Sequence, residues 1–266
     1  MELAVQDNLV PGETPAEKLA NVAACGIEAI EPWFSFIEAA GDEFAAALRD
    51  SPVRMRSVCD DPRRNLGIRD DTHTERFGAA LHALDRYADL GAETVISIGV
   101  FGPADESHPW DAEADTYVEV LQRLGEHVAS AGITMVIECL NRYETHFINT
   151  LAEGATIARR VDLPNVKIMA DFFHMNLEES DMVASMREVG DLLAHVHLAD
   201  SNRFVPGRGH TDFAPCLRYL KEFDYAGVLA MECCLGPSWQ LLGHHGADFV
   251  EELSSAAAYI RSLLAD

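Results

Sequence analysis

The chain has no long hydrophobic run and few basic residues, and both absences narrow its function. It contains no apolar stretch approaching the roughly 20 residues that a membrane-spanning helix requires. Its first residues, Met1-Glu2-Leu3-Ala4-Val5-Gln6, are strand-like and do not have the pattern of a secretory signal. The 266 residues include 20 Lys and Arg against 44 Asp and Glu, a formal net charge of −24. Because such an acidic chain is poorly suited to nucleic acid or anionic membranes, we expect a cytoplasmic protein that binds neither.

The chain also lacks the cysteine patterns of redox and zinc sites. None of its six cysteines belongs to a Cys-x-x-Cys pair, and most lie in apolar segments, so we expect reduced thiols. Cys139 and Cys233 each follow a candidate metal ligand. The alternation of a strand would turn both thiols away from that site, so we do not expect a catalytic cysteine.

Strand-like and helix-like segments alternate along the whole chain, with no linker between them. Each helix is expected between two consecutive strands or after the last one, and Thr14–Glu17 and Thr150–Glu153 have the pattern of capping boxes. The expected strands lie at residues 3–6, 27–31, 53–58, 93–100, 133–137, 166–170, 193–196 and 228–231. This alternation predicts one α/β domain over residues 1–266, a single (βα)8 TIM barrel. The alternative is a doubly wound open sheet, but the Gly-x-Gly-x-x-Gly loop that it would need after the first strand is missing.

Four of these strands end in a residue that can bind a metal. Glu138, Asp171, His197 and Glu232 follow apolar runs and are 33, 26 and 35 positions apart in order, about one strand and one helix each. In a barrel the carboxyl ends of neighbouring strands face one side of the mouth. Three carboxylates and one imidazole there predict a site for one divalent ion, Mn²⁺ first and Co²⁺ or Mg²⁺ as alternatives. A buried salt-bridge network is less suitable, because residues 133–137, 193–196 and 228–231 contain no Lys or Arg.

Three further polar residues follow these strands at short distances. Glu144 lies six residues after Glu138, His174 three after Asp171, and Arg203 six after His197. Each is expected in a loop at the mouth of the barrel. Position alone leaves open whether they contact a substrate or are ordinary polar surface residues. His195 is expected one layer deeper than His197, as a hydrogen-bonded support rather than a ligand.

Three segments of the chain resemble a known family. They are Glu138-Cys139-Leu140-Asn141-Arg142-Tyr143-Glu144-Thr145, Asp171-Phe172-Phe173-His174-Met175-Asn176 and Gly207-Arg208-Gly209-His210. These segments resemble the D-tagatose/D-psicose (allulose) 3-epimerases of the sugar isomerase/epimerase superfamily, which has a xylose isomerase-like barrel. The match is close over about residues 133–235 and weak elsewhere.

The resemblance implies a function for each candidate residue. Glu138, Asp171, His197 and Glu232 would bind the metal, while Glu144, His174 and Arg203 would hold the O1–O3 end of a sugar. Glu138 and Glu232 would also act as acid and base on opposite faces of C3, through an enediolate that the metal stabilises. We therefore expect a metal-dependent isomerase, a ketose 3-epimerase, with a small sugar as its partner and a dimeric or tetrameric assembly of identical chains.

The chain departs from the family pattern in two places. Asp7-Asn8-Leu9-Val10-Pro11-Gly12 replaces an aromatic-rich segment, and Trp239 and His244-His245 occupy a shortened loop after Glu232. These segments would line the far end of the pocket, so they leave the identity of the sugar open.

The alternatives to a ketose 3-epimerase are an aldose–ketose isomerase of the hydroxypyruvate isomerase type, or a metal-dependent lyase or deglycosidase subunit. An endonuclease IV-type repair enzyme fits poorly with the acidic charge, and the sequence assigns no role to Glu31, Trp33, Trp110, Trp239 or His244.

Overall fold

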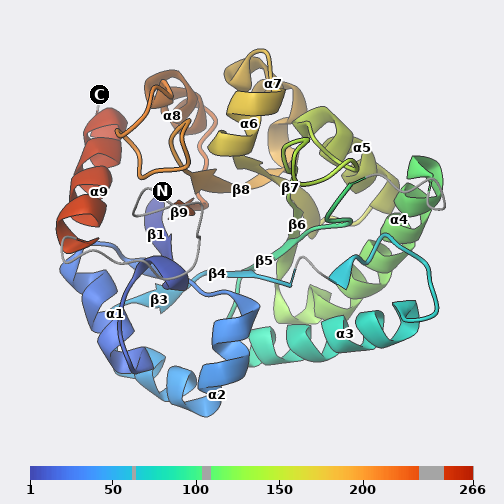
Figure 1. Cartoon of the computed structure of the whole chain (residues 1–266), viewed down its shortest axis with the longest axis horizontal. Helices are drawn as coiled ribbons and strands as arrows, with labels where there is room; N and C mark the ends of the chain where they lie inside the picture. Colours follow the sequence, from blue (N-terminus) through green and yellow to red (C-terminus); the bar gives the residue numbers. More distant parts are fainter. Residues whose placement is uncertain (62–63, 104–108, 234–248, 266) are drawn as a thin grey trace. The chain divides into compact units, whose positions relative to one another are not determined.

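A computed structural model of the chain describes residues 1–61, 64–103, 109–233 and 249–265 (Figure 1). The chain divides into two compact units, which are described separately. Unit 1 consists of Met1–Arg56 and Val196–Asp266, and unit 2 of Ser57–His195. The boundary between them falls within strand β8 (Leu193–Leu198).

Unit 1 is built on parallel strands in the order β3-β2-β1-β9-β8. The strands that complete this set are β1 (Glu2–Gln6), β2 (Ala29–Glu31), β3 (Arg54–Met55) and β9 (Val228–Met231). Ala4, Ala29, Val228 and Ala230 form a buried apolar cluster on β1, β2 and β9. The polar residues Gln6, Glu31 and Glu232 follow this cluster at the carboxyl ends of the three strands.

The helices of unit 1 follow the strands in the chain. They are the 3-10 turn η1 (Asp7–Leu9), α1 (Pro15–Ala24), α2 (Phe34–Arg49), α8 (Phe213–Glu222) and α9 (Phe249–Ala265). The predicted capping box is present at α1, where Thr14 and Glu17 satisfy each other's backbone N–H groups. Gly41 interrupts α2 with a positive φ of 51°, a conformation that favours glycine, so this helix is kinked.

Unit 2 contains a parallel set in the order β7-β6-β5-β4. These strands are β4 (Ser57–Cys59), β5 (Thr94–Ser97), β6 (Thr134–Ile137) and β7 (Val166–Asp171). Their burial is nearly continuous, as expected for parallel strands covered on both faces.

The helices of unit 2 pack side by side, α3 on α4 and α4 on α5, along the outside of these strands (Figure 1). The set is α3 (His73–Asp89), α4 (Trp110–Val128), η3 (Ala129–Ala131), α5 (Leu151–Val161), α6 (Phe172–Glu178), α7 (Met182–Val189) and η4 (Gly190–Leu192). The second predicted capping box, Thr150 with Glu153, begins α5. The repeated strand–helix order agrees with the α/β class predicted from the sequence.

Two elements differ from the prediction. The strand expected at residues 53–58 is interrupted at Arg56, so that β3 and β4 belong to different units. The segment after Asp171 was expected to be a loop but forms the short helix α6, because the Asp171 side chain caps it. The described helices include none that combines the length and the apolar character needed to cross a membrane.

Candidate active site

In unit 1, strand register places four polar side chains on one face of the sheet. Gln6 pairs with Glu31 between β1 and β2, and His197 of β8 pairs with Ala230 of β9. Glu232 lies two residues beyond Ala230, so strand alternation returns it to the face of His197. The exposed fractions of Gln6, Glu31, His197 and Glu232 are 0%, 0%, 0% and 4%, so these groups need partners within the protein.

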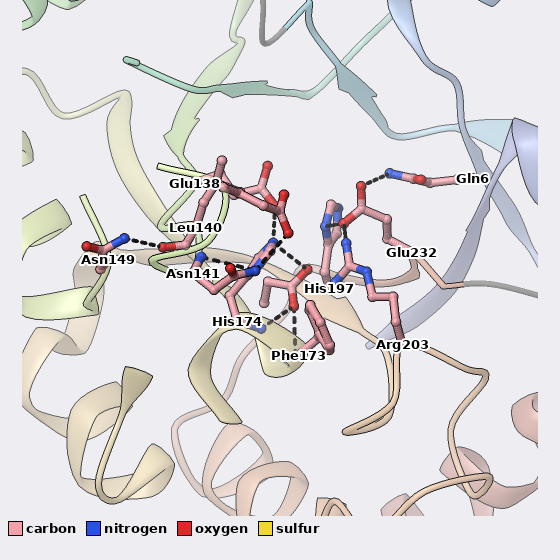
Figure 2. Close-up of polar contacts among 12 residues, drawn as sticks. Gln6, Glu138, Leu140, Asn141, Asn149, Phe173, His174, His197, Arg203 and Glu232 are labelled. Carbon is pink, nitrogen blue, oxygen red and sulfur yellow. Dashed lines mark hydrogen bonds and ion pairs between the residues drawn. The ribbon is translucent and has the colours of Figure 1, made fainter. Parts of the chain in front are cut away.

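Hydrogen bonds join these four side chains into a closed ring, which we call the acid–amide ring. The Nε2 atom of Gln6 donates to Glu232 Oε1 at 3.0 Å (Figure 2). The same atom donates to Glu31 Oε1 at 3.2 Å. Across the ring, His197 Nε2 lies 2.8 Å from Glu31 Oε1, and His197 Nδ1 lies 3.0 Å from Glu232 Oε2. The acid–amide ring therefore consists of Gln6, Glu31, His197 and Glu232.

Arg203 approaches the acid–amide ring from the loop that follows β8. Its guanidinium group donates to Glu232 Oε2, and both side chains are buried. Its backbone φ is 63°, a left-handed conformation that is uncommon for a residue with a side chain and is often found at functional sites. The backbone N–H of Arg203 donates to the carbonyl oxygen of Asp200 at 2.8 Å. This turn directs the guanidinium group toward Glu232.

The buried carboxylate of Asp200 holds this loop together. It accepts backbone N–H groups from Ser201 at 2.8 Å, Gly207 at 2.9 Å and Thr211 at 3.0 Å. Burial alone would raise the pKa of Asp200, but the hydrogen bonds from backbone donors, Thr211 first, hold it below its usual range. The loop that carries Arg203 is therefore anchored by an ionised carboxylate.

In unit 2, strand register places Glu138 and Asp171 on one face. Ile137 of β6 pairs with Ile168 of β7, so Glu138 and Asp171, one and three residues further along, point to the same side. Both are buried, with exposed fractions of 4% and 2%. Asp171 Oδ1 accepts the backbone N–H groups of Phe173 and His174 at 2.7 and 3.0 Å and caps α6. The other oxygen, Oδ2, lies on the side of His174 Nε2, 3.8 Å away.

Asn141 fixes the ring of His174. The Nδ1 atom of His174 accepts the backbone N–H of Asn141 at 3.2 Å and lies 2.8 Å from its side-chain Nδ2 (Figure 2). A neutral imidazole whose Nδ1 accepts carries its proton on Nε2. That Nε2 lies 3.8 Å from both Glu138 Oε1 and Asp171 Oδ2. His174 therefore presents a donor toward the carboxylates, which suits an oxygen-binding role better than metal ligation.

Asn141 also positions Glu144. Its Nδ2 atom donates to Glu144 Oε1 at 2.7 Å, so a single amide contacts both Glu144 and His174. Unit 2 thus brings together Glu138, Asp171, His174 and Glu144, and unit 1 brings together His197, Glu232 and Arg203.

The donor atoms of both units fit a divalent metal ion. In unit 2, Glu138 and Asp171 each offer a carboxylate oxygen, and these oxygens lie within 4.8 Å of each other, with His174 beside them as a donor. In unit 1, His197 Nδ1 and Glu232 Oε2 are 3.0 Å apart, the spacing of adjacent ligands around an ion with bonds of about 2.1 Å. With Nε2–H directed to Glu31, His197 directs Nδ1 toward the Glu232 carboxylate, and a cation that replaced the Nδ1 proton would be held by both groups. Carboxylates with imidazole are the ligands of Mn²⁺, Co²⁺ and Mg²⁺ rather than of a thiolate zinc site.

The cysteine that follows Glu138 is turned away from it. Cys25, Cys59, Cys139, Cys216 and Cys233 are buried thiols. Cys139 packs under Gly154 of α5, where a Cβ on the glycine would come within 2.7 Å of its sulfur, so its thiol points away from the strand face of Glu138. Burial raises the pKa of this thiol well above its usual range, which leaves it protonated and unreactive.

Sequence reasoning gave no role to three residues that the structure places among these groups. Glu31 was recognised only as another acid at a strand end, Asn141 only as part of a motif, and Gln6 only as the end of the first strand. For Gln6 and Glu31, the signal available in the sequence was the alternation of the strand. A polar residue at the carboxyl end of a buried strand lies on the same face as the residue two positions earlier. Trp239, His244 and His245 lie outside the described residues.

Comparison with known proteins agrees with the family resemblance of the sequence motifs and extends it along most of the chain. The family model described as "Xylose isomerase-like TIM barrel" matches residues 19–257. D-psicose 3-epimerase from Agrobacterium fabrum is 32% identical over 224 residues, which cover 80% of this chain and 77% of that protein. The 3-dehydro-D-guloside 4-epimerase of Escherichia coli is 27% identical over 87% of this chain and 92% of its own.

The fold agrees with these relatives. A crystal structure of D-psicose 3-epimerase with D-tagatose from Clostridium cellulolyticum H10 matches with a TM-score of 0.88 and 23% identity, covering 99% of both chains. This likeness confirms the predicted TIM barrel, and the relatives confirm the predicted resemblance to the ketose 3-epimerases. The chain belongs to the xylose isomerase-like TIM barrel family, and its relatives include ketose 3-epimerases.

Proposed function

We propose that this protein is a divalent-metal-dependent epimerase that inverts C3 of a ketose. The observation that carries the proposal is a set of buried acids at strand ends, Glu138 and Asp171 in unit 2 and Glu232 in unit 1, each contacted by or facing an imidazole. Active sites of TIM barrels lie at the carboxyl ends of the strands. The proposed metal ligands are Glu138, Asp171, His197 and Glu232, as expected from the sequence.

The two glutamates have the chemistry that epimerisation requires. Inverting a carbon beside a ketone means removing its proton from one face and returning a proton to the other. Glu138 would serve one face and Glu232 the other, each alternating between base and acid according to the direction of the reaction. When bound, the metal ion supplies positive charge that stabilises the negative charge developing on the sugar oxygens.

The remaining residues hold the substrate. His174 presents Nε2–H, Arg203 presents a guanidinium group and Glu144 presents a carboxylate held by Asn141, a set of donors and an acceptor suited to adjacent hydroxyl and keto oxygens. We propose that these three residues hold the O1–O3 end of the sugar. Their side chains are fixed by hydrogen bonds before substrate arrives, which lowers the entropic cost of orienting it.

The finer features of the enzyme are also proposals. The oxygen-rich donor set supports Mn²⁺ as the ion, with Co²⁺ or Mg²⁺ able to replace it. The buried thiols support a cytoplasmic location. We further propose that the chain is a single domain that assembles as a dimer or a tetramer.

A second reaction on the same site is supported by the relative from Escherichia coli. That protein is named 3-dehydro-D-guloside 4-epimerase, and the match to it covers 92% of its length. In such a substrate C4 lies beside the C3 ketone, so proton removal and return follow the same chemistry. The sequence departs from the ketose 3-epimerases at residues 7–12 and after Glu232, and these differences are consistent with a different sugar as substrate.

A substrate panel distinguishes the two reactions. Protein loaded with Mn²⁺ would be incubated with D-psicose, D-tagatose, L-ribulose and 3-dehydro-D-guloside, and products would be identified by NMR. Inversion at C3 of a free ketose, with the highest kcat/KM in the panel, is the expected result. Preference for the guloside would assign the second reaction, and turnover of none of these sugars would contradict both.

A further inference from the structure

We infer that Gln6 and Glu31 are positioning residues that set the orientation of His197 and Glu232 for metal binding, and that Trp33 fixes the orientation of Gln6. The inference deepens the proposed function and rests on its assignment of His197 and Glu232 as ligands. All five residues belong to unit 1, and four of them form the acid–amide ring.

The first step is the contact from Trp33 to Gln6. The indole Nε1 of Trp33 lies 2.9 Å from Gln6 Oε1. An indole nitrogen can only donate a hydrogen bond, so the atom that faces it must be the amide oxygen. This contact determines which end of the Gln6 amide faces Trp33 and leaves the NH₂ group directed into the acid–amide ring. The backbone N–H of Trp33 donates to Asp7 Oδ1 at 2.7 Å, and this contact fixes the backbone from which the indole extends.

The second step is the contact from Gln6 to two carboxylates. Its NH₂ group lies 3.2 Å from Glu31 Oε1 and 3.0 Å from Glu232 Oε1. An uncharged donor that bridges two buried acids reduces their repulsion without adding a charge that would compete with a metal cation. Because Gln6 holds Oε1 of Glu232, the other oxygen, Oε2, is turned toward His197 Nδ1 and the Arg203 guanidinium group. A residue at the end of β1 thereby selects the carboxylate oxygen offered to the ion.

The third step is the contact from Glu31 to His197. Glu31 Oε1 accepts from Gln6 and lies 2.8 Å from His197 Nε2. An ionised carboxylate can only accept, so the contact with Glu31 keeps a proton on His197 Nε2. The contact with Glu232 likewise implies a proton on Nδ1 in the metal-free protein, and a metal ion bound at Nδ1 would replace that proton. A carboxylate behind a metal-binding imidazole fixes the tautomer and the ring orientation, and loss of such a partner typically weakens metal binding about 10- to 100-fold. The arrangement therefore gives Glu31 a role through His197 rather than as a ligand.

Titration with Mn²⁺ alone tests this chain of contacts without any sugar. Dissociation constants would be measured by electron paramagnetic resonance for the wild type, Glu31→Ala, Gln6→Leu and Trp33→Phe. We expect affinity to fall about 10- to 100-fold for Glu31→Ala, about tenfold for Gln6→Leu and a few-fold for Trp33→Phe. The matched control is Glu28→Gln. Glu28 lies three residues before Glu31 and pairs with Arg261 at the surface, so this variant should bind Mn²⁺ as the wild type does. Wild-type affinity in both Glu31→Ala and Gln6→Leu would overturn the inference.

A double-mutant cycle separates positioning from general damage to the fold. If Trp33 acts through Gln6, then Trp33→Phe should weaken Mn²⁺ binding in the wild type but not in the Gln6→Leu background. Trp110→Phe removes an indole donor of the same kind, which contacts the Phe147 carbonyl oxygen at 2.5 Å in unit 2, and its effect should be additive with Gln6→Leu. Full additivity of Trp33→Phe and Gln6→Leu would contradict the proposed order of contacts.

The tautomer of His197 gives a readout that depends on neither metal nor catalysis. In ¹⁵N-histidine NMR of the metal-free protein, we expect a hydrogen-bonded proton on Nε2, assigned by its loss in His197→Asn. Glu31→Ala should expose that proton to rapid exchange, while Glu28→Gln should retain it. An unprotonated Nε2 in the wild type would overturn the inference even if the protein proved to be an epimerase. Conversely, a protonated Nε2 in a protein without epimerase activity would leave the inference standing and contradict only the proposed function.

Discussion

The two units hold their candidate site residues in different ways. In unit 1, side chains from four strands hold one another in the acid–amide ring, and the glutamine amide is its only uncharged donor besides the imidazole. In unit 2, backbone groups carry much of the same task, since Asp171 accepts two backbone N–H groups and His174 accepts one from Asn141. Substitutions of single side chains should therefore disturb the orientation of site residues more in unit 1 than in unit 2.

The largest effect should come from Asp171, which has two roles in unit 2. Asp171→Ala removes a proposed ligand and the cap of α6, so we expect loss of bound metal and about 1 kcal/mol of stability. Asp171→Asn should also lose metal but keep most of the stability, because an amide oxygen can still cap. The control is Asp181→Ala, which removes the cap of α7 at Ala184 and should leave metal content unchanged. Full metal content in Asp171→Ala, measured by elemental analysis, would remove this residue from the ligand set.

The next largest effect should come from the substrate-holding residues, one in each unit. Arg203→Ala and His174→Ala should each lower kcat/KM about 100-fold, or roughly 2–4 kcal/mol of transition-state stabilisation, while metal is retained. Arg208→Ala is the matched control, because Arg208 lies on the same loop as Arg203 and pairs with Glu252 at the surface. If Arg203→Ala turned over the preferred sugar at the wild-type rate, the resemblance would have assigned the wrong residue.

A smaller effect is expected at Asn141, and it sharpens the comparison between the units. Asn141→Ala removes the amide that holds Glu144 and His174, but the backbone N–H to His174 Nδ1 remains. We therefore expect about a tenfold loss in kcat/KM, since the loss of side-chain hydrogen bonds of about 1 kcal/mol each is partly offset by the backbone contact that remains. A loss as large as that of His174→Ala would show that the side chain, not the backbone, fixes this imidazole.

The effect that bears least on metal and substrate concerns Asp7, which follows Gln6 and holds the backbone of Trp33. Burial, outweighing the Trp33 hydrogen bond and the charge of Lys18, raises the pKa of Asp7 from 3.8 to about 6. A raised acid pKa stabilises the fold below about pH 4, and this contribution is lost as pH rises through about 6. Its size is on the order of 2–3 kcal/mol. Asp7→Asn keeps the acceptor for Trp33 and should flatten this part of the pH dependence, measured by urea unfolding of metal-free protein from pH 4 to 7. Parallel curves for variant and wild type would contradict the raised pKa.

Much of the fold and of the ligand set could be predicted from the sequence. Apolar runs that end in Glu138, Asp171, His197 and Glu232 recur at the spacing of one strand and one helix, and this periodicity follows directly from barrel geometry. The capping boxes at Thr14 and Thr150 were visible for the same reason, because their partners are three residues away. Signals of this kind depend on local spacing.

The contacts that set orientation could not be predicted in the same way. Gln6 and Glu232 are 226 residues apart, and His197 and Glu31 are 166 apart, so no local pattern links them. The role of Gln6 depends on which end of its amide faces Trp33, which only the three-dimensional arrangement reveals. Helix α6 was missed because the Asp171 that caps it already had an interpretation as a metal ligand.

Deuterium incorporation into a ketose in D₂O tests the central claim most directly. With the Mn²⁺-loaded wild type we expect deuterium at C3 of both epimers, because each face exchanges through its own carboxylate. Glu138→Gln and Glu232→Gln should both fail to interconvert the epimers, and each should label only one epimer, with the two variants labelling opposite ones. Deuterium at C1 instead of C3, or interconversion at the wild-type rate in either variant, would contradict the two-carboxylate epimerase.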